Sequence, residues 1–409
     1  MVKVAVLGYG TVGTGVVEVI HANRELLKER IGQPIDVKYI LVRREIPDCS
    51  VWEKLTQDFE KILADPEISI VAEVMGGIEP AFTYAKRCLE AGKSVVTSNK
   101  ELVAKHGDEL IALAQKRQVQ FLFEGSVAGG IPVIRTLHGC LTGDAVTEIV
   151  GILNGTTNYM MTNMFQNGAD YAEVLAEAQE HGYAERNPEA DVEGYDACRK
   201  IAILTSLVSG KKADFEEIYC EGITRITTDD MKYAKQMGKT IKLLAIMKKE
   251  EDGTYQVKVA PFLLDAGHPL YSVDGVFNSV LIRGNMVGEV MLYGKGAGKL
   301  PTASAVVADL VEAARHPAKS VMPVWSGEKL SLQEAKKARH RFFLRLKTEG
   351  MTKDHLERML GEGTEVTAGI PGETGFVTKE MTEEDFEKAI AEAEQEILSV
   401  IRVEESPAI

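Results

Sequence analysis

The chain has 409 residues, of which 45% are apolar and 26% are charged, as in folded globular proteins of about two or three domains. This balance excludes a chain that is mainly disordered, collagenous or coiled coil. With 47 basic and 61 acidic residues the net charge is −14, which argues against binding to nucleic acid or to an anionic membrane surface.

The cysteines are few and scattered, and no two of them form a C-x-x-C pair: they are Cys49, Cys88, Cys140, Cys198 and Cys220. This pattern argues against a disulfide framework and a cysteine-based zinc site. It favours a reducing compartment, so we expect a cytoplasmic protein. No apolar run reaches the roughly 20 residues of a membrane span. The apolar stretch 2–20 is interrupted by four glycines, so we interpret it as part of the fold and not as a signal peptide.

Residues 1–130 alternate short apolar runs with amphipathic stretches. This spacing predicts βαβ units around a parallel sheet, so the fold class is α/β, with a Rossmann-type, doubly wound dinucleotide-binding domain at the N-terminus. We expect strands at 2–7, 37–42, 68–75, 94–97 and 119–123, and helices at 13–30, 57–64, 80–91 and 101–117.

Residues 131–300 are less regular and predict a mixed α/β domain for substrate binding and dimerisation. We expect one long helix at 193–208, and strands at 240–247, 255–264, 276–282 and 287–293. The stretch 300–316 has the pattern of a further helix, which we expect to pack back on the first domain.

Residues 317–337 contain two prolines and a lysine-rich tail, which is typical of a linker. A new pattern begins in residues 338–409. Its βαββαβ order is that of a ferredoxin-like domain. The expected elements are a strand at 340–347, a helix at 352–360, strands at 364–369 and 375–379, a helix at 383–394 and a strand at 398–403.

A glycine-rich turn follows the first apolar strand and opens the first helix, with the sequence Gly8-Tyr9-Gly10-Thr11-Val12-Gly13. In such a G-x-G-x-x-G fingerprint the glycines allow a tight turn, a close approach of the backbone to a pyrophosphate, and close packing of helix on strand. The N–H groups at the start of the helix then face the phosphates. We therefore expect these residues to bind a dinucleotide, and the alternative is a purely structural turn.

The second strand ends in Leu41-Val42-Arg43-Arg44, at the place where dinucleotide-binding domains select their cofactor. An acidic residue there binds the ribose 2′-hydroxyl of NAD, whereas an arginine suits the 2′-phosphate of NADP. Arg43 and Arg44 therefore favour NADP(H). Because Glu45 follows them, NAD(H) stays a second candidate. A solvated arginine pair on a surface loop is the alternative to a cofactor contact.

Three further segments follow strands of the expected parallel sheet, at the edge where ligands bind in such folds: 75–77, 98–100 and 124–131. Gly76 and Ser98 are therefore expected to line the cofactor site. Lys100 is a candidate for polarising a carbonyl or holding a carboxylate, and its alternative is a surface lysine at a helix start. Glu124 precedes a glycine-rich loop. One carboxylate with several carbonyls suits a hard cation, and a glycine-rich domain crossing is the alternative.

A dense polar cluster lies before the expected long helix. Pro188 biases the residue before it away from the helical region, so Glu185 and Asp191 are expected on a loop. Asp196 and Lys200 lie four residues apart and therefore on one face of the helix. Three carboxylates and a lysine in one site suit a substrate with an amino group, because the carboxylates hold the ammonium while the lysine serves a reacting oxygen. The alternative is an exposed salt bridge, which contributes little to stability.

On these residues the chain resembles the homoserine dehydrogenases, over nearly its whole length. The segment from Ala178 to Lys200 matches that family's signature at every defined position: an alanine, a glycine after three free positions, an Asn-Pro, and then Asp-x-x-Gly-x-Asp-x-x-x-Lys. The other matching segments are the N-terminal glycine-rich turn, Asn99-Lys100, 124–132, 154–158 and 293–298.

The resemblance implies an NAD(P)-dependent oxidoreductase acting on the CH–OH group, which reversibly reduces L-aspartate 4-semialdehyde to L-homoserine in threonine, methionine and isoleucine biosynthesis. It implies that Lys200 donates and accepts the proton at the reacting oxygen, and that Asp196 orients the site. It places Lys100 beside the substrate and the nicotinamide. It implies that Glu185 and Asp191 hold the amino end of the substrate.

The resemblance also implies a sodium ion. Its ligands here are the carboxylate of Glu124 and the carbonyls of Val127, Gly129 and Ile131. A cofactor contact is implied at Gly296.

The C-terminal domain resembles the ACT module that many bacterial members of the family carry, where threonine gives feedback inhibition. Its first strand matches, but the usual Asp-x-Pro-Gly turn reads Thr348-Glu349-Gly350-Met351-Thr352 here. Threonine regulation and a role in assembly alone are therefore the two interpretations of this domain. We expect a homodimer or a homotetramer.

Two other hypotheses fit parts of the sequence. A different Rossmann-domain reductase, such as an aspartate-semialdehyde or sugar dehydrogenase, is one of them. The former needs an activated cysteine, and none of the five stands at a glycine-rich or helix-start site. An amino-acid sensor without turnover is the other, and the complete set of Lys100, Lys200, Glu185 and Asp191 argues against it.

Overall fold

The computed structural model describes residues 1–46, 50–348, 353–391 and 397–404. Contacts between residues group the chain into two compact units. Unit 1 contains residues 1–145, 202–215 and 294–330, and unit 2 contains 146–201, 216–293 and 331–409. The division of the sequence into functional domains at 1–130, 131–300, 317–337 and 338–409 stays a prediction.

Within the described residues, unit 1 is built on a six-stranded sheet with the strand order β3-β2-β1-β4-β5-β6. Every neighbouring pair in it is parallel. This is the strand order of doubly wound dinucleotide-binding folds, as the sequence predicts. The strands are β1 (Val2–Leu7), β2 (Ile35–Leu41), β3 (Leu55–Thr56), β4 (Ile68–Glu73), β5 (Ser94–Thr97) and β6 (Phe121–Leu122).

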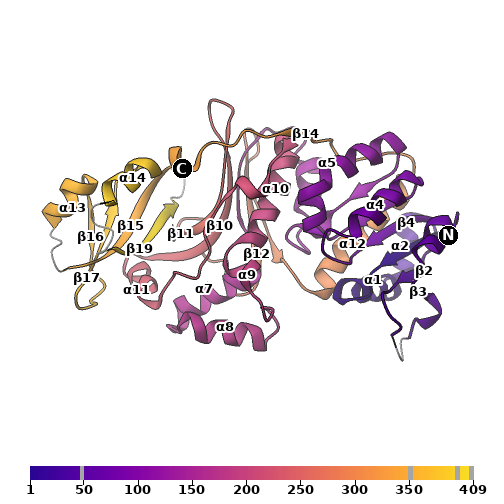
Figure 1. Ribbon diagram of the computed structural model, residues 1–409, viewed down its shortest axis with the longest axis horizontal. Coiled ribbons are helices and arrows are strands. Elements are labelled where there is room, and N and C mark those ends of the chain that lie inside the picture. The colour runs from indigo at the N-terminus through magenta and orange to yellow at the C-terminus, as the bar shows by residue number, and fades with distance from the viewer. Residues whose placement is uncertain (47–49, 349–352, 392–396, 405–409) are drawn as a thin grey trace. The chain divides into compact units, whose positions relative to one another are not determined.

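Helices cover both faces of this sheet, which is why its strands are nearly continuous apolar runs. Figure 1 shows α1, α2 and α12 on one side of it and α4 and α5 on the other. The helix α12 lies directly against α1, since a Cβ added to Gly15 would be 2.8 Å from the Cβ of Ala303. The helices are α1 (Thr11–Ala22), α2 (Arg24–Ile31), α3 (Phe59–Ala64), α4 (Ala81–Glu90), α5 (Lys100–Arg117), α6 (Val133–Arg135) and α12 (Lys299–Arg315).

The prediction of a single helix at 13–30 is wrong, because the structure has two helices there. Asn23 ends the first and begins the second, with φ −106° and ψ 22°, outside the helical region. An asparagine can take this conformation at low cost because its short polar side chain competes with helical backbone bonding. Apolar periodicity continues across the break, so the pattern alone does not reveal it.

The stretch 317–337 is more than a connector. Trp325 is buried, its ring packs on that of Phe123, and a Cβ on Gly107 would lie 2.4 Å from it. The next residues form β14 (Ser326–Lys329), which pairs with β8 (Lys211–Lys212).

Unit 2 is built on one mixed sheet, for which the described residues supply eleven strands. Its order is β13-β12-β7-β10-β11-β19-β15-β17-β16, with β9 beside β11 and β18 beside β15. The strands of the middle region are β7 (Val146–Ile152), β9 (Tyr219–Cys220), β10 (Lys239–Lys249), β11 (Tyr255–Asp265), β12 (Phe277–Gly284) and β13 (Gly288–Lys295). Their apolar side chains form a core around Phe262 and Leu244.

The helices of the middle region flank this sheet (Figure 1). They are α7 (Gly155–Asn167), α8 (Tyr171–Glu180), α9 (Glu189–Val192), α10 (Tyr195–Ser209) and α11 (Thr228–Gln236). The long helix α10 is divided between the two units: its residues up to Ile201 belong to unit 2, and those from Ala202 onward belong to unit 1.

The C-terminal residues have the predicted βαββαβ order. Their strands run β19-β15-β17-β16 with every pair antiparallel, which is the ferredoxin-like arrangement. The elements are β15 (Arg339–Lys347), α13 (Lys353–Leu360), β16 (Gly363–Val366), β17 (Glu373–Thr378), β18 (Met381–Thr382), α14 (Glu383–Ile390) and β19 (Ile397–Glu404). The divergent turn at 349–352 lies outside the described residues.

The sequence does not predict how this βαββαβ unit joins the rest of the sheet. Its edge strand β19 pairs in parallel with β11, with Phe262 opposite Arg402. The two sheets are therefore continuous, and the C-terminal strands cannot be removed without exposing an edge of β11.

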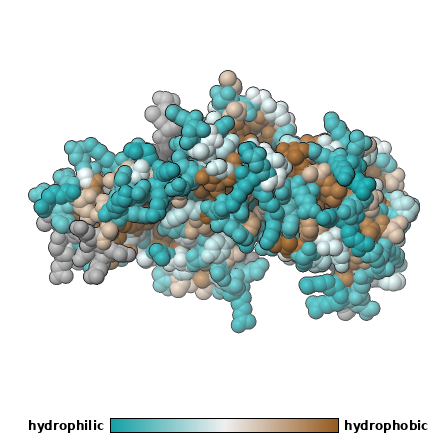
Figure 2. All heavy atoms as spheres, turned by 45° about the horizontal axis from the view of Figure 1, so that its top comes forward, coloured by the Kyte–Doolittle hydropathy of each residue, from teal (hydrophilic) through white to brown (hydrophobic). Residues whose placement is uncertain are grey.

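Among the described residues no helix is long and apolar enough to cross a membrane. Figure 2 shows hydrophilic side chains over much of the face that it displays.

Candidate functional site

The glycine-rich turn between β1 and α1 has the geometry of a phosphate-binding turn. Gly8 has a φ of +104°, which residues other than glycine rarely adopt. A Cβ on Gly13 would lie only 2.1 Å from the carbonyl oxygen of Gly8, so this position requires glycine. A Cβ on Gly10 would meet nothing within 4 Å, which leaves the start of α1 open to a ligand. The backbone here therefore fits a pyrophosphate at a helix N-terminus.

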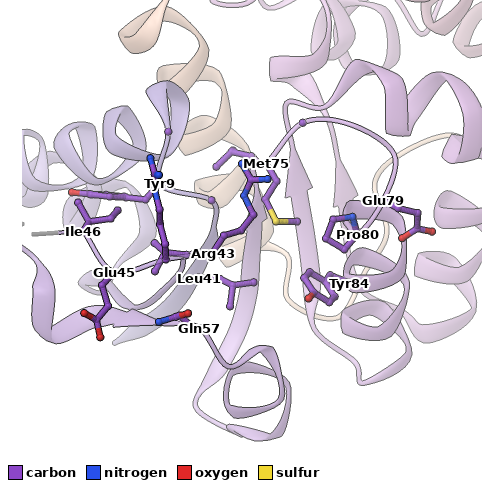
Figure 3. A pocket seen from close by; sticks show the side chains of 16 residues that line it. Tyr9, Leu41, Arg43, Glu45, Ile46, Gln57, Met75, Glu79, Pro80 and Tyr84 are labelled. Carbon is purple, nitrogen blue, oxygen red and sulfur yellow. The ribbon is translucent and has the colours of Figure 1, made fainter.

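A cavity of about 1340 Å³ opens at this turn, along the carboxyl ends of β1, β2 and β4. Figure 3 shows the side chains of Tyr9, Arg43 and Met75 around it. Its lining residues are Gly8, Tyr9, Gly10, Leu41, Val42, Arg43, Arg44, Glu45, Ile46, Gln57, Val74, Met75, Gly76, Glu79, Pro80 and Tyr84. The fold thus brings five of the predicted cofactor residues together: Gly8, Gly10, Arg43, Arg44 and Gly76.

The other predicted cofactor residues do not line this cavity. Thr11, Val12 and Gly13 form the first turns of α1 behind it, while Ser98 and Lys100 follow β5. Gly296 lies elsewhere in unit 1, where its carbonyl would be 2.5 Å from a Cβ on Gly129.

Two polar residues that the sequence analysis did not predict as site residues, Glu73 and Asn99, organise the strand ends near Lys100. Glu73 is fully buried and accepts hydrogen bonds from the Thr97 hydroxyl at 2.6 Å and from the Met75 N–H at 2.8 Å. Burial raises the pKa of its carboxyl. Asn99 caps α5 through the N–H of Leu102 at 3.1 Å. Lys100 is therefore the first residue of a capped helix and is half-buried. An asparagine before a helical pattern is a cap signal, but a lone glutamate at a strand end carries no such signal.

Glu124 is buried in unit 1. Its two carboxylate oxygens accept the backbone N–H groups of Ile134 at 2.9 Å and Arg135 at 2.8 Å. Its own N–H donates to Asp309 at 2.8 Å, and the side chain of Arg135 also donates to Asp309 at 2.8 Å. Burial raises the pKa of Glu124, and burial together with the charge of Glu124 raises that of Asp309 to about 8.

The loop after Glu124 has the irregular backbone that the sequence suggests. Ala128 and Gly129 both have positive φ, at 54° and 51°. The N–H of Gly130 donates to the carbonyl of Lys295 at 3.1 Å, and the carbonyl of Ile131 accepts the N–H of Val133 at 2.8 Å. Val127 is fully buried beside them. Among the described residues no group of three or more histidine, cysteine, aspartate or glutamate side chains is placed to hold a metal.

A buried polar cluster lies in unit 2, at the start of α10. Lys200 donates to Asp196 at 2.7 Å and to the carbonyl of Leu153 at 2.7 Å. The amide of Asn154 donates to Asp196 at 2.9 Å and to Asp191 at 2.7 Å. Lys200 and Asp196 are 8% and 3% exposed, so this is not the solvated salt bridge that was the alternative.

Asn154 was not singled out by the sequence as a site residue, yet it links both carboxylates. Its side-chain oxygen also caps α7 by accepting the N–H of Thr157 at 2.9 Å, which fixes the direction of its amide group. The N-cap pattern Asn-x-x-Thr after a buried strand could have indicated the cap, but not the contacts with Asp191 and Asp196.

Two details of this cluster differ from the expectation. Asp191 lies in the short helix α9 and not on a loop, because Pro188 takes the N-cap position, where its missing N–H is no obstacle. Glu185 is exposed, and its carbonyl accepts the amide of Gln179 at 3.1 Å. The described contacts bring Asp191, Asp196 and Lys200 together but do not bring Glu185 to them.

The comparisons with known proteins agree on one family. Residues 132–311 match the family model "Homoserine dehydrogenase", and residues 8–124 match "Homoserine dehydrogenase, NAD binding domain". The chain belongs to the homoserine dehydrogenase family. Both matches end by residue 311, so the C-terminal βαββαβ unit lies outside them.

Relatives and solved structures support this family membership. The homoserine dehydrogenase of Mycobacterium tuberculosis is 47% identical over 320 residues, which is 77% of this chain and 73% of that protein. That of Bacillus subtilis is 43% identical over 316 residues, covering 76% and 72%. The crystal structure of a homoserine dehydrogenase from Thiobacillus denitrificans has a TM-score of 0.90 at 35% identity and covers 99% of this chain and 98% of that one.

A hyperthermophilic archaeal homoserine dehydrogenase in complex with NADPH is also similar, with a TM-score of 0.65 at 28% identity, covering 76% of this chain and 97% of that one. As a homoserine dehydrogenase, the chain is an NAD(P)-dependent oxidoreductase that acts on the CH–OH group and interconverts L-homoserine and L-aspartate 4-semialdehyde in amino-acid biosynthesis. This excludes the sensor without turnover and the other Rossmann-domain reductases.

Proposed function

We propose that Lys200 transfers the proton in this reaction and that Asp196 orients it. The observation that carries the proposal is the buried ion pair at 2.7 Å, held by α10 and by the carbonyl of Leu153. Reduction of the aldehyde develops negative charge on its oxygen, which a nearby ammonium stabilises and protonates. A lysine four residues after an aspartate on one helix is well placed for this, because the helix and the aspartate limit its rotamers.

The chemistry that a bound nicotinamide cofactor supplies is hydride transfer at the reacting carbon. The turn from Gly8 to Gly13 fits its pyrophosphate, because a Cβ at Gly13 would clash with the turn while Gly10 faces open space. Thr11 and Val12 contribute N–H groups at the start of α1. Ser98 and Gly296 complete the predicted cofactor contacts.

NADP(H) is the preferred cofactor under this proposal. Arg43 and Arg44 both line the cavity and are exposed, so their guanidinium groups can reach a 2′-phosphate without being desolvated. Glu45 lines the same cavity and would repel that phosphate, which leaves NAD(H) as the weaker second cofactor.

The amino end of the substrate binds to carboxylates of unit 2. Asp191 receives a hydrogen bond from Asn154, and this fixes its orientation toward Asp196 and Lys200. Glu185 extends this acidic surface from its exposed position. Lys100, at the start of α5 in unit 1, is the second lysine under this proposal, serving the substrate and the nicotinamide.

A sodium ion at Glu124 fits the charge and the oxygen donors around this carboxylate. The carboxylate of Glu124 is buried, and the guanidinium of Arg135 donates to Asp309 at 2.8 Å, so a monovalent cation would offset the charge of Glu124. Each carboxylate oxygen has a second lone pair beyond the N–H bond that it accepts. The carbonyls of Val127, Gly129 and Ile131 are the further ligands under this proposal.

The chain further acts as a homodimer or homotetramer in the cytoplasm. Exposed apolar side chains at Met286, Met291 and Tyr293, on and beside the edge strand β13, favour such an interface. Threonine is the candidate effector of the ACT-like unit, which has the βαββαβ topology.

Steady-state kinetics test these assignments. The full-length protein is given L-homoserine with NADP⁺ or NAD⁺, and reduced nicotinamide is followed by absorbance, with and without threonine. We expect turnover with a kcat/KM roughly tenfold or more in favour of NADP⁺, since an arginine–phosphate contact is a strong charge-assisted bond. In Asp191→Asn we expect a higher KM for homoserine and an unchanged KM for NADP⁺. Equal use of both cofactors would refute the roles of Arg43 and Arg44.

A further inference from the structure

A buried arginine connects the C-terminal βαββαβ unit to the middle region of unit 2. Arg402 of β19 donates to both oxygens of Glu383, at 2.7 and 2.8 Å. Its other amino group donates to Glu221 at 2.6 Å. The amino group that binds Glu383 also donates to the hydroxyl of Tyr219 at 3.0 Å, and that hydroxyl donates to Glu221 at 3.0 Å. With 6% of its surface exposed, Arg402 is held between two carboxylates from different parts of the chain.

The charges of this cluster balance. Lys258 of β11 forms an ion pair with Glu383, so two cations face the carboxylates of Glu383 and Glu221. Although burial opposes it, the hydrogen bonds and charge of Arg402 lower the pKa of Glu383 to about 2. Burial and the nearby Arg402 lower the pKa of Lys258 to about 8. Arg402 bridges the two carboxylates, because its planar guanidinium can donate hydrogen bonds to both at once.

Glu221 belongs to the segment 219–223, which touches the corner between α9 and α10. The N–H of Ile223 donates to the carbonyl of Val192 at 2.8 Å, and the thiol of Cys220 donates to that of Glu193 at 3.2 Å. A Cβ on Gly222 would lie 2.1 Å from the carbonyl oxygen of Val192, so the two backbones are in direct contact. Any shift of this segment must therefore shift the corner.

The corner carries Asp191, the carboxylate that we propose binds the amino end of the substrate. Asp191 directly precedes Val192, and Asn154 joins Asp191 to Asp196 at 2.7 and 2.9 Å. The contacts therefore run without interruption from Arg402 through Glu221 to Asp191, and all of them lie within unit 2.

We propose that Arg402 and Glu221 are positioning residues for substrate binding: the C-terminal unit sets, through the segment 219–223, the place of Asp191 and so the affinity for the amino end of the substrate. This inference rests on the proposed role of Asp191. It gives the C-terminal unit a part in the basal reaction, independent of any effector.

The test uses the full-length protein with Arg402→Lys and Glu221→Gln, alone and combined. Arg402→Lys keeps the charge but cannot bridge two carboxylates, and Glu221→Gln keeps the shape but removes the ion pair. Each single variant is expected to raise the KM for homoserine roughly threefold to tenfold, which lies in the lower part of the range of coupling between residues that share a contact. The KM for NADP⁺ and kcat should change less than twofold. Because both act through one contact, the double variant should be no worse than the more affected single variant.

Arg345→Lys is the matched control. Arg345 lies on the neighbouring strand β15, is 7% exposed and donates to Asp230 at 2.9 Å and to Thr227 at 2.6 Å, two residues outside the segment 219–223. It should lower thermal stability by a similar amount and leave the KM for homoserine unchanged. An equal rise of that KM in Arg345→Lys, or a parallel rise in the KM for NADP⁺, would overturn the proposal.

Asp191→Asn separates this inference from the proposed function. If Asp191→Asn raises the KM for homoserine while the Arg402 and Glu221 variants do not, the positioning role is wrong and the substrate site stands. If Asp191→Asn leaves that KM unchanged, the substrate site and the positioning role both fail.

Discussion

The replacement of Lys200 by methionine tests the proposed proton transfer most directly. Methionine keeps an unbranched apolar stem of four heavy atoms and removes the ammonium that donates to Asp196 and to the carbonyl of Leu153. General acid–base catalysis by a positioned side chain contributes about 10²- to 10⁴-fold to a rate. We therefore expect kcat to fall by that factor, which corresponds to about 3 to 5 kcal/mol in the activation free energy.

The same replacement also affects folding, and its cost can be bounded from the structure. Asp196 is 3% exposed and would lose its cation while keeping the hydrogen bond from Asn154. Removing one partner of a buried ion pair typically costs about 3 to 5 kcal/mol of stability, and the remaining amide donor reduces that cost. The assay must therefore be run well below the unfolding temperature of the variant.

Lys242→Met provides the control for the loss of a buried lysine. Lys242 is 1% exposed and donates to Asp274 at 2.8 Å and to the carbonyl of Val273 at 2.7 Å, neither of which belongs to the Lys200 cluster. The Lys242→Met variant should lose about as much stability as Lys200→Met and keep the kcat of the wild type. Rates are followed as reduced nicotinamide with homoserine and NADP⁺, and unfolding is followed by circular dichroism.

A kcat for Lys200→Met within threefold of the wild type, in folded protein, would refute the assignment of Lys200 as the proton donor. A large rise in the KM for homoserine without a fall in kcat would instead make Lys200 a binding residue. In the wild type, homoserine oxidation should be faster at alkaline pH than at neutral pH, because a lysine must lose its proton before it can accept one.

Three further predictions follow from single contacts. Gly13→Ala should abolish dinucleotide binding in a fluorescence titration with NADPH, because the new methyl group would lie 2.1 Å from the carbonyl of Gly8; unchanged affinity would contradict the turn geometry. Arg43→Ala should raise the KM for NADP⁺ and leave that for NAD⁺ unaffected, and equal changes would exclude a phosphate contact. His268 accepts the N–H of Leu270 at 3.1 Å, and burial lowers its pKa to about 4. Between about pH 6.5 and pH 4 the unfolded state therefore binds more protons at this histidine than the folded state does. The melting temperature should therefore fall as pH drops from about 6.5 toward 4, and fall less steeply in His268→Asn.

The fold of the N-terminal third was readable from the sequence because buried parallel strands are nearly continuous apolar runs, and β1, β4 and β5 are of this kind. The glycine-rich turn was readable for a similar reason, since its conformation depends on residues next to each other in the chain. Local patterns failed where a break leaves no mark on periodicity, as at Asn23.

The candidate site shows the same division. The pairing of Asp196 with Lys200 follows from a spacing of four residues on a helix, so the sequence predicts it. The contacts of Asn154 with Asp191 and Asp196 join residues 37 and 42 positions apart, and no local rule connects them. Burial, which distinguishes this cluster from a solvated salt bridge, is likewise set by what the rest of the chain places around it.

By itself, then, the sequence determined the class of fold, the dinucleotide turn and the helix face that carries the lysine, because each depends on periodicity or on the conformational limits of neighbouring residues. Only the tertiary structure decided that β19 extends the sheet at β11 and that Arg402 meets Glu221 across 181 positions of the chain. Strand pairing and buried ion pairs between distant segments depend on the packing of the whole unit, and many pairings satisfy the same local pattern.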